Sequence, residues 1–341
     1  MSDSAKKDSA DKAIALIRSQ MQGRDAQSLA NALMKGDRAS LAKAITCIES
    51  GPEDVASEIV RLCLPASGRS LRMGITGVPG VGKSTFIDTF GMSLLEAGRK
   101  VAVLAVDPSS PISKGSILGD KTRMERLAAD SRAFIRPSPS SETLGGVARK
   151  TRETILLCEA AGYDTILVET VGVGQSETAV HAMTDFFVLL MLAGAGDQLQ
   201  GIKRGIMEMA DMLVINKAEG DNLPLAKRAA VNYRNALHLF PAHPGSWTPL
   251  VQLCSAIDGS GVAEVWKSVE SYFDLCIPNG YRNQKRAEQR LQHFHEYTRQ
   301  RLEQQLLGRP AQQERLQALE KEVSEGRVSP YTAARQLLAG L

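Results

Sequence analysis

The sequence has no long apolar run and no strong excess of charge of either sign. Its longest apolar stretch covers residues 186–195, which is far shorter than the roughly 20 residues that span a bilayer. The net charge is +3 over 341 residues, and no strongly basic run appears. These absences argue against a membrane span and against a nucleic-acid partner. We expect a globular protein in which residues 186–195 form a buried strand.

Paired cysteines and an N-terminal apolar segment are also missing. The five cysteines are scattered, and none forms a Cys-x-x-Cys pair: Cys47, Cys63, Cys158, Cys254 and Cys276. This pattern excludes a disulfide framework and a zinc site of the usual spacing. The N-terminus lacks the apolar core of a secretory signal, and its acids Asp3, Asp8 and Asp11 are atypical of a mitochondrial presequence. We therefore predict a cytoplasmic protein.

The chain alternates short apolar runs with longer amphipathic segments, and this order predicts three parts. Residues 1–65 carry helical periodicity, residues 66–278 alternate strands and helices, and residues 279–341 are helical and polar. The strings that predict strands are "LRMGITG", "KVAVLAVD", "RAFIRP", "YDTILVET", "DFFVLLML", "DMLVIN" and "TPLVQLCSA". Continuous apolar runs of this kind are typical of parallel strands covered on both faces. We predict a doubly wound α/β domain with a mostly parallel sheet.

The C-terminal part has the pattern of a charged helical arm. An apolar stripe at helical spacing consists of Leu291, Phe294, Tyr297 and Leu302. A second helix is expected after Pro310, and Ser329-Pro330 offers an N-cap and first-turn proline for a short third helix. From the pattern alone, the arm either pairs with another subunit or folds back on its own domain.

The string "GVPGVGKST" follows a predicted strand and precedes a predicted helix, and it predicts a phosphate-binding loop. Its residues are Gly77, Val78, Pro79, Gly80, Val81, Gly82, Lys83, Ser84 and Thr85. The glycines let the backbone N–H groups face a phosphate chain, and the helix N-terminus adds its dipole. Lys83 is expected to reach the β- and γ-phosphates, and the Ser84 hydroxyl is expected to bind Mg²⁺. A plain glycine-rich turn is the weaker alternative.

Three carboxylates are candidates for the same magnesium ion. Asp107 and Glu169 each end a predicted buried strand, and Asp120 lies in the loop string "ILGDKTRM". Carboxylate oxygens are suitable ligands for Mg²⁺ or for its bound waters. Gly172, three residues after Glu169, can offer its N–H to a γ-phosphate. The alternative for each acid is a helix cap or a solvated loop charge.

The string "NKAE" after the last-but-one predicted strand indicates a guanine-reading loop. GTPases commonly read guanine with Asn-Lys-x-Asp, so Asn216 and Lys217 match and Glu219 is one methylene longer than the usual Asp. A second base-contacting loop is expected at Ser255, Ala256 and Ile257, as in the Ser-Ala loop whose backbone N–H meets guanine O6. Glu219 must then accept hydrogen bonds from guanine N1–H and N2–H, with Asp221 as a weaker alternative reader.

Several strings together resemble one family, the MeaB/ArgK-type GTPases, which are G-protein chaperones of adenosylcobalamin-dependent methylmalonyl-CoA mutase. The strings are "GVPGVGKSTFID", "AVDPSSP", "ILGDKTRM", "FIRPSPSSETLGGVA", "YDTILVETVGVGQSE" and "GDQLQGIKRGIMEMADMLVINKAEGDN". The resemblance runs from about Gly36 into the C-terminal helices. Glu219 also stands where this family usually has Asp.

The resemblance implies a SIMIBI-class G domain with an N-terminal helical extension and a C-terminal dimerisation arm. It implies magnesium contacts from Ser84, Asp107, Asp120 and Glu169. It also implies a nucleotide-sensing segment, "GDQLQGIKRG", in which Gln200 and Lys203 make switch contacts and join Lys83 and Glu169 as catalytic candidates. The implied client is a cobalamin-dependent acyl-CoA mutase, with GTP and Mg²⁺ as ligands and a homodimer as the assembly.

Two other function classes remain open from the sequence. The first is a P-loop kinase or ATPase linked to basic amino-acid transport, which is the older naming of similar proteins. The second is a nickel-delivering GTPase, which would be expected to carry a Cys/His cluster. His293 and His295 do not supply one, because two residues apart on a helix they do not share a face.

Overall fold

A computed structural model describes residues 25–106, 124–137, 144–170, 176–194, 204–308 and 310–339. Contacts divide the chain into one unit that ends at Arg282 and a second unit that begins at Asn283. None of the helices in these ranges is long and apolar enough to cross a membrane.

The first unit is built on a seven-stranded sheet whose neighbouring strands all run parallel. The strands are β1 (Leu71–Gly77), β2 (Val101–Val106), β3 (Ala133–Arg136), β4 (Thr165–Thr170), β5 (Phe186–Leu192), β6 (Met212–Asn216) and β7 (Leu250–Leu253). Their order is β3-β2-β4-β1-β5-β6-β7, which confirms the predicted parallel α/β fold. Parallel strands put their carboxyl ends on one edge, and ligands bind there at the point where the strand order reverses, beside β1.

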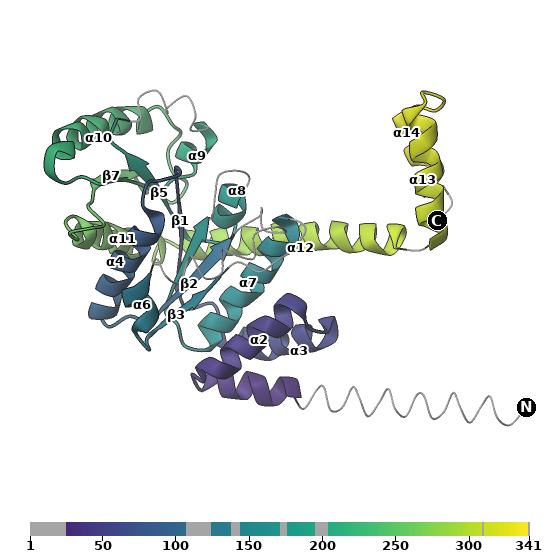
Figure 1. Cartoon of the computed structure of the whole chain (residues 1–341), viewed down its shortest axis with the longest axis horizontal. Helices are drawn as coiled ribbons and strands as arrows, with labels where there is room; N and C mark the ends of the chain where they lie inside the picture. The colour runs from purple at the N-terminus through teal and green to yellow at the C-terminus, as the bar shows by residue number, and fades with distance from the viewer. Residues whose placement is uncertain are drawn as a thin grey trace, which may run out of the picture. The chain divides into compact units, whose positions relative to one another are not determined.

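Helices cover both faces of this sheet (Figure 1). Their bounds are α4 (Lys83–Glu96), α6 (Glu125–Ala129), α7 (Leu144–Ala160), α8 (Ser176–His181), α9 (Arg204–Glu208), α10 (Leu223–Leu237) and α11 (Val262–Cys276). Alternate strand residues point to opposite faces. Val101 and Val103 pack with α4, α6 and α11, whereas Ala102 and Leu104 pack with α7. Burial on both faces explains why the strands read as continuous apolar runs.

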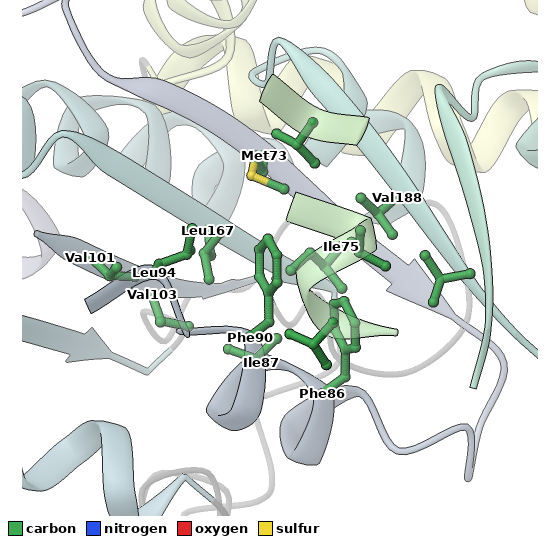
Figure 2. Close-up of a cluster of buried hydrophobic side chains, with 14 of the residues drawn as sticks. Met73, Ile75, Phe86, Ile87, Phe90, Leu94, Val101, Val103, Leu167 and Val188 are labelled. Atoms are coloured by element: carbon green, nitrogen blue, oxygen red, sulfur yellow. The ribbon is translucent and has the colours of Figure 1, made fainter. Parts of the chain in front are cut away.

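The hydrophobic core on the α4 face of the sheet contains several packed aromatic side chains. Figure 2 shows Phe86 and Phe90 of α4 against Met73, Ile75 and Val188 of the sheet. The rings of Phe86 and Phe90 stack at 5.4 Å between centroids. Because α4 begins with the phosphate-loop lysine, this packing anchors the helix whose N-terminus faces the site.

The N-terminal helices pack on the α7 face. They comprise helical residues 25–34, α2 (Arg38–Ser50) and α3 (Glu53–Cys63), and a short 3-10 turn (Leu64–Ala66) follows them. Gly36 has φ 86°, and the Asp37 side chain accepts the Ser40 N–H at the start of α2. The string "GDRASLAKAI" predicts a turn at Gly36-Asp37 with a new helix behind it, and the structure confirms both. The periodic residues before position 25 lie outside the described part of the chain.

Asp185 and Asp211, which directly precede two strands, are buried acids. Asp185 accepts the Arg72 N–H at 3.0 Å, and Asp211 accepts the Phe187 N–H at 2.8 Å. Each carboxylate thus joins its own strand to a neighbour. Glu159 is similarly buried and accepts bonds from Gly68 N–H, the Ser70 hydroxyl and the Arg72 guanidinium. Burial opposes ionisation of Glu159, but these bonds and the charge of Arg72 hold its pKa below the ordinary value.

The second unit is helical, as expected. It contains most of α12 (Tyr281–Leu307), with α13 (Pro310–Ser324) and α14 (Pro330–Leu338) after it. The Ser329 hydroxyl accepts the Thr332 N–H, and Pro330 occupies the first turn of α14, so the predicted cap is confirmed. Along α12, Leu291, Phe294 and Leu302 are more than half exposed within this chain.

Candidate nucleotide-binding site

The loop between β1 and α4 has the backbone of a phosphate cradle. Gly80 and Gly82 have φ of 74° and 87°, a region that residues with a Cβ rarely adopt. A Cβ at Gly77 would lie 2.6 Å from the Leu190 carbonyl oxygen, so this position also requires glycine. The loop therefore curls tightly, and the N-terminus of α4 opens onto it.

Lys83 is the cation of this loop. Its Nζ donates to the Gly77 carbonyl at 2.9 Å, which holds the ammonium across the mouth of the loop. Burial lowers the pKa of Lys83, while the charges of Glu169 and Glu177 act to raise it. The ammonium is thus close to two carboxylates, as expected for a site that handles phosphate charge together with a divalent cation.

The described residues fit a magnesium ion at this place. Glu169 is buried near the carboxyl end of β4, directly beside β1, where its register partner is Ile75. Ser84 is the second residue of α4. A hydroxyl and a carboxylate beside a phosphate loop are the hard oxygen ligands that Mg²⁺ prefers. Asp107 and Asp120 lie outside the described residues, although β2 ends at Val106, immediately before Asp107.

Glu177 is a residue of this site that the sequence reasoning missed. It lies in the first turn of α8, is 5% exposed and acts electrostatically on Lys83. The sequence feature that could have identified Glu177 is its position at the end of the string "VGVGQSE", directly after the loop that follows β4. Gly172 and Gln175 of that loop lie outside the described part of the chain.

Asn216, the last residue of β6, joins the phosphate loop to the second base loop. Its Nδ2 donates to the Val81 carbonyl at 2.7 Å, and its Oδ1 accepts the Ala256 N–H at 3.1 Å. Asn216 is 1% exposed, so both bonds are shielded from water. Segments that are 135 and 40 residues away in sequence therefore meet at one side chain.

The next residues of the loop face the same place. Lys217 has φ 59°, and its Nζ donates to the Gly80 carbonyl at 2.9 Å, so its aliphatic chain crosses the phosphate loop. Glu219 is half-buried, and its Oε2 is buried without a hydrogen-bond partner among the described residues. Asp221 is exposed in the following 3-10 turn (Gly220–Asn222), which weakens it as a substitute reader of the base.

The second base loop is held by its own turn. Ser255 N–H donates to the Ser260 carbonyl, and the Ser255 hydroxyl accepts the Asp258 N–H. At Gly261 a Cβ would lie 2.1 Å from the Leu253 carbonyl oxygen, so the chain needs glycine to enter α11. Ser255 and Ala256 are buried, whereas the Ile257 side chain is 76% exposed.

The structure thus brings together the described members of the predicted site and leaves the others undescribed. Residues 77–85, Glu169, Asn216, Lys217, Glu219 and residues 255–257 lie at or beside the carboxyl edge of the sheet. Gln200 and Lys203, with Asp107 and Asp120, lie outside the described residues. A phosphate loop, a base loop and a parallel sheet in this arrangement define a P-loop nucleotide-binding protein.

Comparison with known proteins shows which family of P-loop nucleotide-binding proteins this chain belongs to. The model of the family "Methylmalonyl Co-A mutase-associated GTPase MeaB" matches residues 41–311. The chain is 45% identical over 312 residues to GTPase ArgK of Escherichia coli, covering 89% of this chain and 93% of that protein. It is 44% identical over 319 residues to the mouse protein "Methylmalonic aciduria type A homolog, mitochondrial", covering 90% and 77% respectively.

A solved structure has the same fold over nearly the whole chain. The crystal structure of a protein named "LAO/AO transport system kinase" superposes with a TM-score of 0.74 at 38% identity, covering 92% of this chain and 96% of that one. The chain belongs to the MeaB family and is a GTPase. This confirms the resemblance drawn from the sequence strings.

Proposed function

We propose that this GTPase is a magnesium-dependent chaperone that gates cobalamin loading into an acyl-CoA mutase of the methylmalonyl-CoA mutase type and protects that enzyme. The observation that carries the proposal is the link through Asn216, which fastens the phosphate loop to the base loop. This link makes the two loops parts of one hydrogen-bonded site. The family description, which names association with methylmalonyl-CoA mutase, supplies the client.

Within this proposal each site residue has a role. Residues 77–85 bind the phosphates, with Lys83 neutralising the β- and γ-charges. Ser84, Asp107, Asp120 and Glu169 hold Mg²⁺ directly or through water. A Mg²⁺ ion held by these residues would offset the negative charge that develops on the phosphate during transfer. Catalysis then rests on positioning and electrostatics.

Base reading is assigned to the two linked loops. Glu219 accepts from guanine N1–H and N2–H, and its buried Oε2, which has no partner among the described residues, is the oxygen available for one of these bonds. Asn216, Lys217 and residues 255–257 hold the base from the other sides. The longer side chain of Glu219 is accommodated by a change of rotamer.

The client mutase is expected to stimulate GTP hydrolysis. Basal turnover should be slow, on the order of 10⁻⁴–10⁻² per second, as in G domains without a partner. A mutase that orders the segment "GDQLQGIKRG" would raise this rate, and Lys203→Ala should reduce the stimulated-to-basal ratio. The measurement is phosphate release with and without the mutase, for wild type and variant.

Lys227→Ala is the matched control, because this exposed lysine on α10 loses the same charge away from the site. Its stimulation ratio should equal that of wild type. Absence of stimulation, together with no complex in any nucleotide state, would leave a GTPase without this client.

The rival function is a P-loop kinase, the activity named for the protein in the similar crystal structure. A kinase does not need to read guanine, whereas the described residues include two base loops joined at Asn216. This arrangement favours the GTPase over an ATP-dependent kinase. A cytoplasmic location is also part of the proposal.

We also propose that residues 279–341 form a dimerisation arm, because Leu291, Phe294 and Leu302 expose an apolar stripe on α12. Wild type should sediment as a dimer, and the full-length double variant Leu291→Glu/Phe294→Glu should sediment as a monomer in analytical ultracentrifugation. Gln300→Glu is the control, because Gln300 lies about two and a half turns after Leu291 and therefore on the opposite side of the same helix. A dimer that persists in the double variant would argue against this arm.

A further inference from the structure

Thr89, on the second turn of α4, reaches from the phosphate-loop helix to the second base loop. Its Oγ1 donates to the Ala256 carbonyl at 2.7 Å, across 167 residues of sequence. The same Oγ1 accepts a bond from the Arg126 Nη2 at 2.7 Å. Nothing in the nucleotide-binding motifs marks either residue.

Simple donor and acceptor chemistry fixes the direction of this chain of bonds. A guanidinium only donates and a carbonyl oxygen only accepts, so the single Thr89 proton must point to Ala256. The charge of Arg126 polarises the hydroxyl and strengthens its bond to the carbonyl.

Arg126 is itself held in place by α4. Its Nε donates to Asp88 Oδ2 at 2.7 Å, and the other Asp88 oxygen accepts the Leu127 N–H at 2.9 Å. Asp88 is 7% exposed, whereas the Arg126 side chain is 59% exposed. The buried acid therefore presents an otherwise solvated guanidinium to Thr89.

Both backbone polar groups of Ala256 are therefore hydrogen-bonded to side chains. Asn216 accepts a bond from its N–H, and Thr89 donates one to its carbonyl oxygen. Ala256 is 3% exposed, so water cannot replace either bond readily. These two bonds set the orientation of the backbone that is presented to a base at residues 255–257.

We propose that Thr89 is a positioning residue for guanine binding, with Arg126 acting through it. The proposal rests on the guanine site assigned above and adds a contact that no base-reading motif contains. Thr89 acts on the loop that meets guanine O6, and Glu219 acts on the N1–H and N2–H edge. Loss of the Thr89 hydroxyl should therefore weaken every nucleotide that carries O6 by the same factor.

The test is Thr89→Val, which keeps the shape of the side chain and removes the hydroxyl. Its dissociation constants for GDP and for IDP, measured with fluorescent analogues, should each rise about three- to tenfold. IDP keeps O6 and lacks the 2-amino group, so equal factors exclude an effect that acts through the 2-amino group. Thr89→Ser restores the hydroxyl and should return both constants to within about twofold of wild type.

Thr154→Val is the matched control, since this buried threonine bonds only to the Lys150 carbonyl of its own helix α7 among the described contacts. It should leave both dissociation constants unchanged. KM for GTP should rise in Thr89→Val by about the factor seen for GDP, with a smaller change in kcat. A merely structural defect would lower kcat and thermal stability together and would not be rescued by serine.

Arg126→Lys is a second variant, at a side chain that is 59% exposed. It should raise the GDP dissociation constant about twofold, and it should add nothing in the Thr89→Val background, because it acts through the lost hydroxyl. If Thr89→Val does not fold, an unchanged constant in Arg126→Lys overturns the proposal.

The remaining outcomes separate this inference from the guanine site on which it rests. If Asn216→Ala loses nucleotide while Thr89→Val binds like wild type, the guanine site stands and the role of Thr89 is wrong. If Thr89→Val weakens GDP but not IDP, the effect comes from the other edge of the base and the proposal is also wrong. If Asn216→Ala binds GDP normally, both the site and the inference fall.

Discussion

GTP hydrolysis is expected to be abolished when Lys83 is replaced by alanine. The ammonium lies across the mouth of the phosphate loop, 2.9 Å from the Gly77 carbonyl, and it is the only lysine of that loop. In phosphoryl transfer the protein contributes mainly position and charge. Loss of one preorganised donor of this kind costs on the order of 10²–10³ in rate. Phosphate release at saturating GTP should therefore fall to background.

Lys100→Ala is the control for this variant. Lys100→Ala removes the same single positive charge as Lys83→Ala. Lys100 is exposed just before β2, at the opposite edge of the sheet from the carboxyl ends, and is therefore away from the site. It should keep normal turnover. Near-normal turnover in a folded Lys83→Ala protein, verified by its thermal unfolding, would overturn the assignment of the phosphate site.

Replacing Asn216 by alanine should have the next largest effect, on nucleotide affinity. The change leaves the Val81 carbonyl and the Ala256 N–H without their partner in a buried place. A buried polar group left unpaired costs about 1–3 kcal/mol, so both together amount to roughly 2–6 kcal/mol. The GDP dissociation constant should rise on the order of a hundredfold or more, as measured by isothermal titration calorimetry.

Asn232→Ala provides the comparison, because this exposed asparagine lies on α10 away from both loops. Its affinity should match wild type. An Asn216→Ala protein that binds GDP within about threefold of wild type would show that the two loops do not depend on this link. The base-reading assignment of Glu219 would then lose its structural support.

The sequence by itself determined the elements and the motifs, because both depend on local information. All seven predicted strands form, since runs such as residues 186–192 are apolar on both faces and can only be buried between helices. The phosphate loop follows from its glycines and Lys83, and the base loop from Asn216 and Lys217. The start of α2 at Asp37 and of α14 at Ser329 followed from capping residues.

Only the tertiary structure decided which distant side chains meet. The sequence places Asp185 and Asp211 directly before strands, but only the parallel register shows that each carboxylate accepts a backbone N–H of the neighbouring strand. The charge of Glu177 acts on Lys83 because α8 packs against β1 and β4. The Thr89 bond to Ala256 depends on packing α4 against the start of α11. Contacts of this kind leave no periodic or compositional trace, because they join single residues that are far apart in the chain.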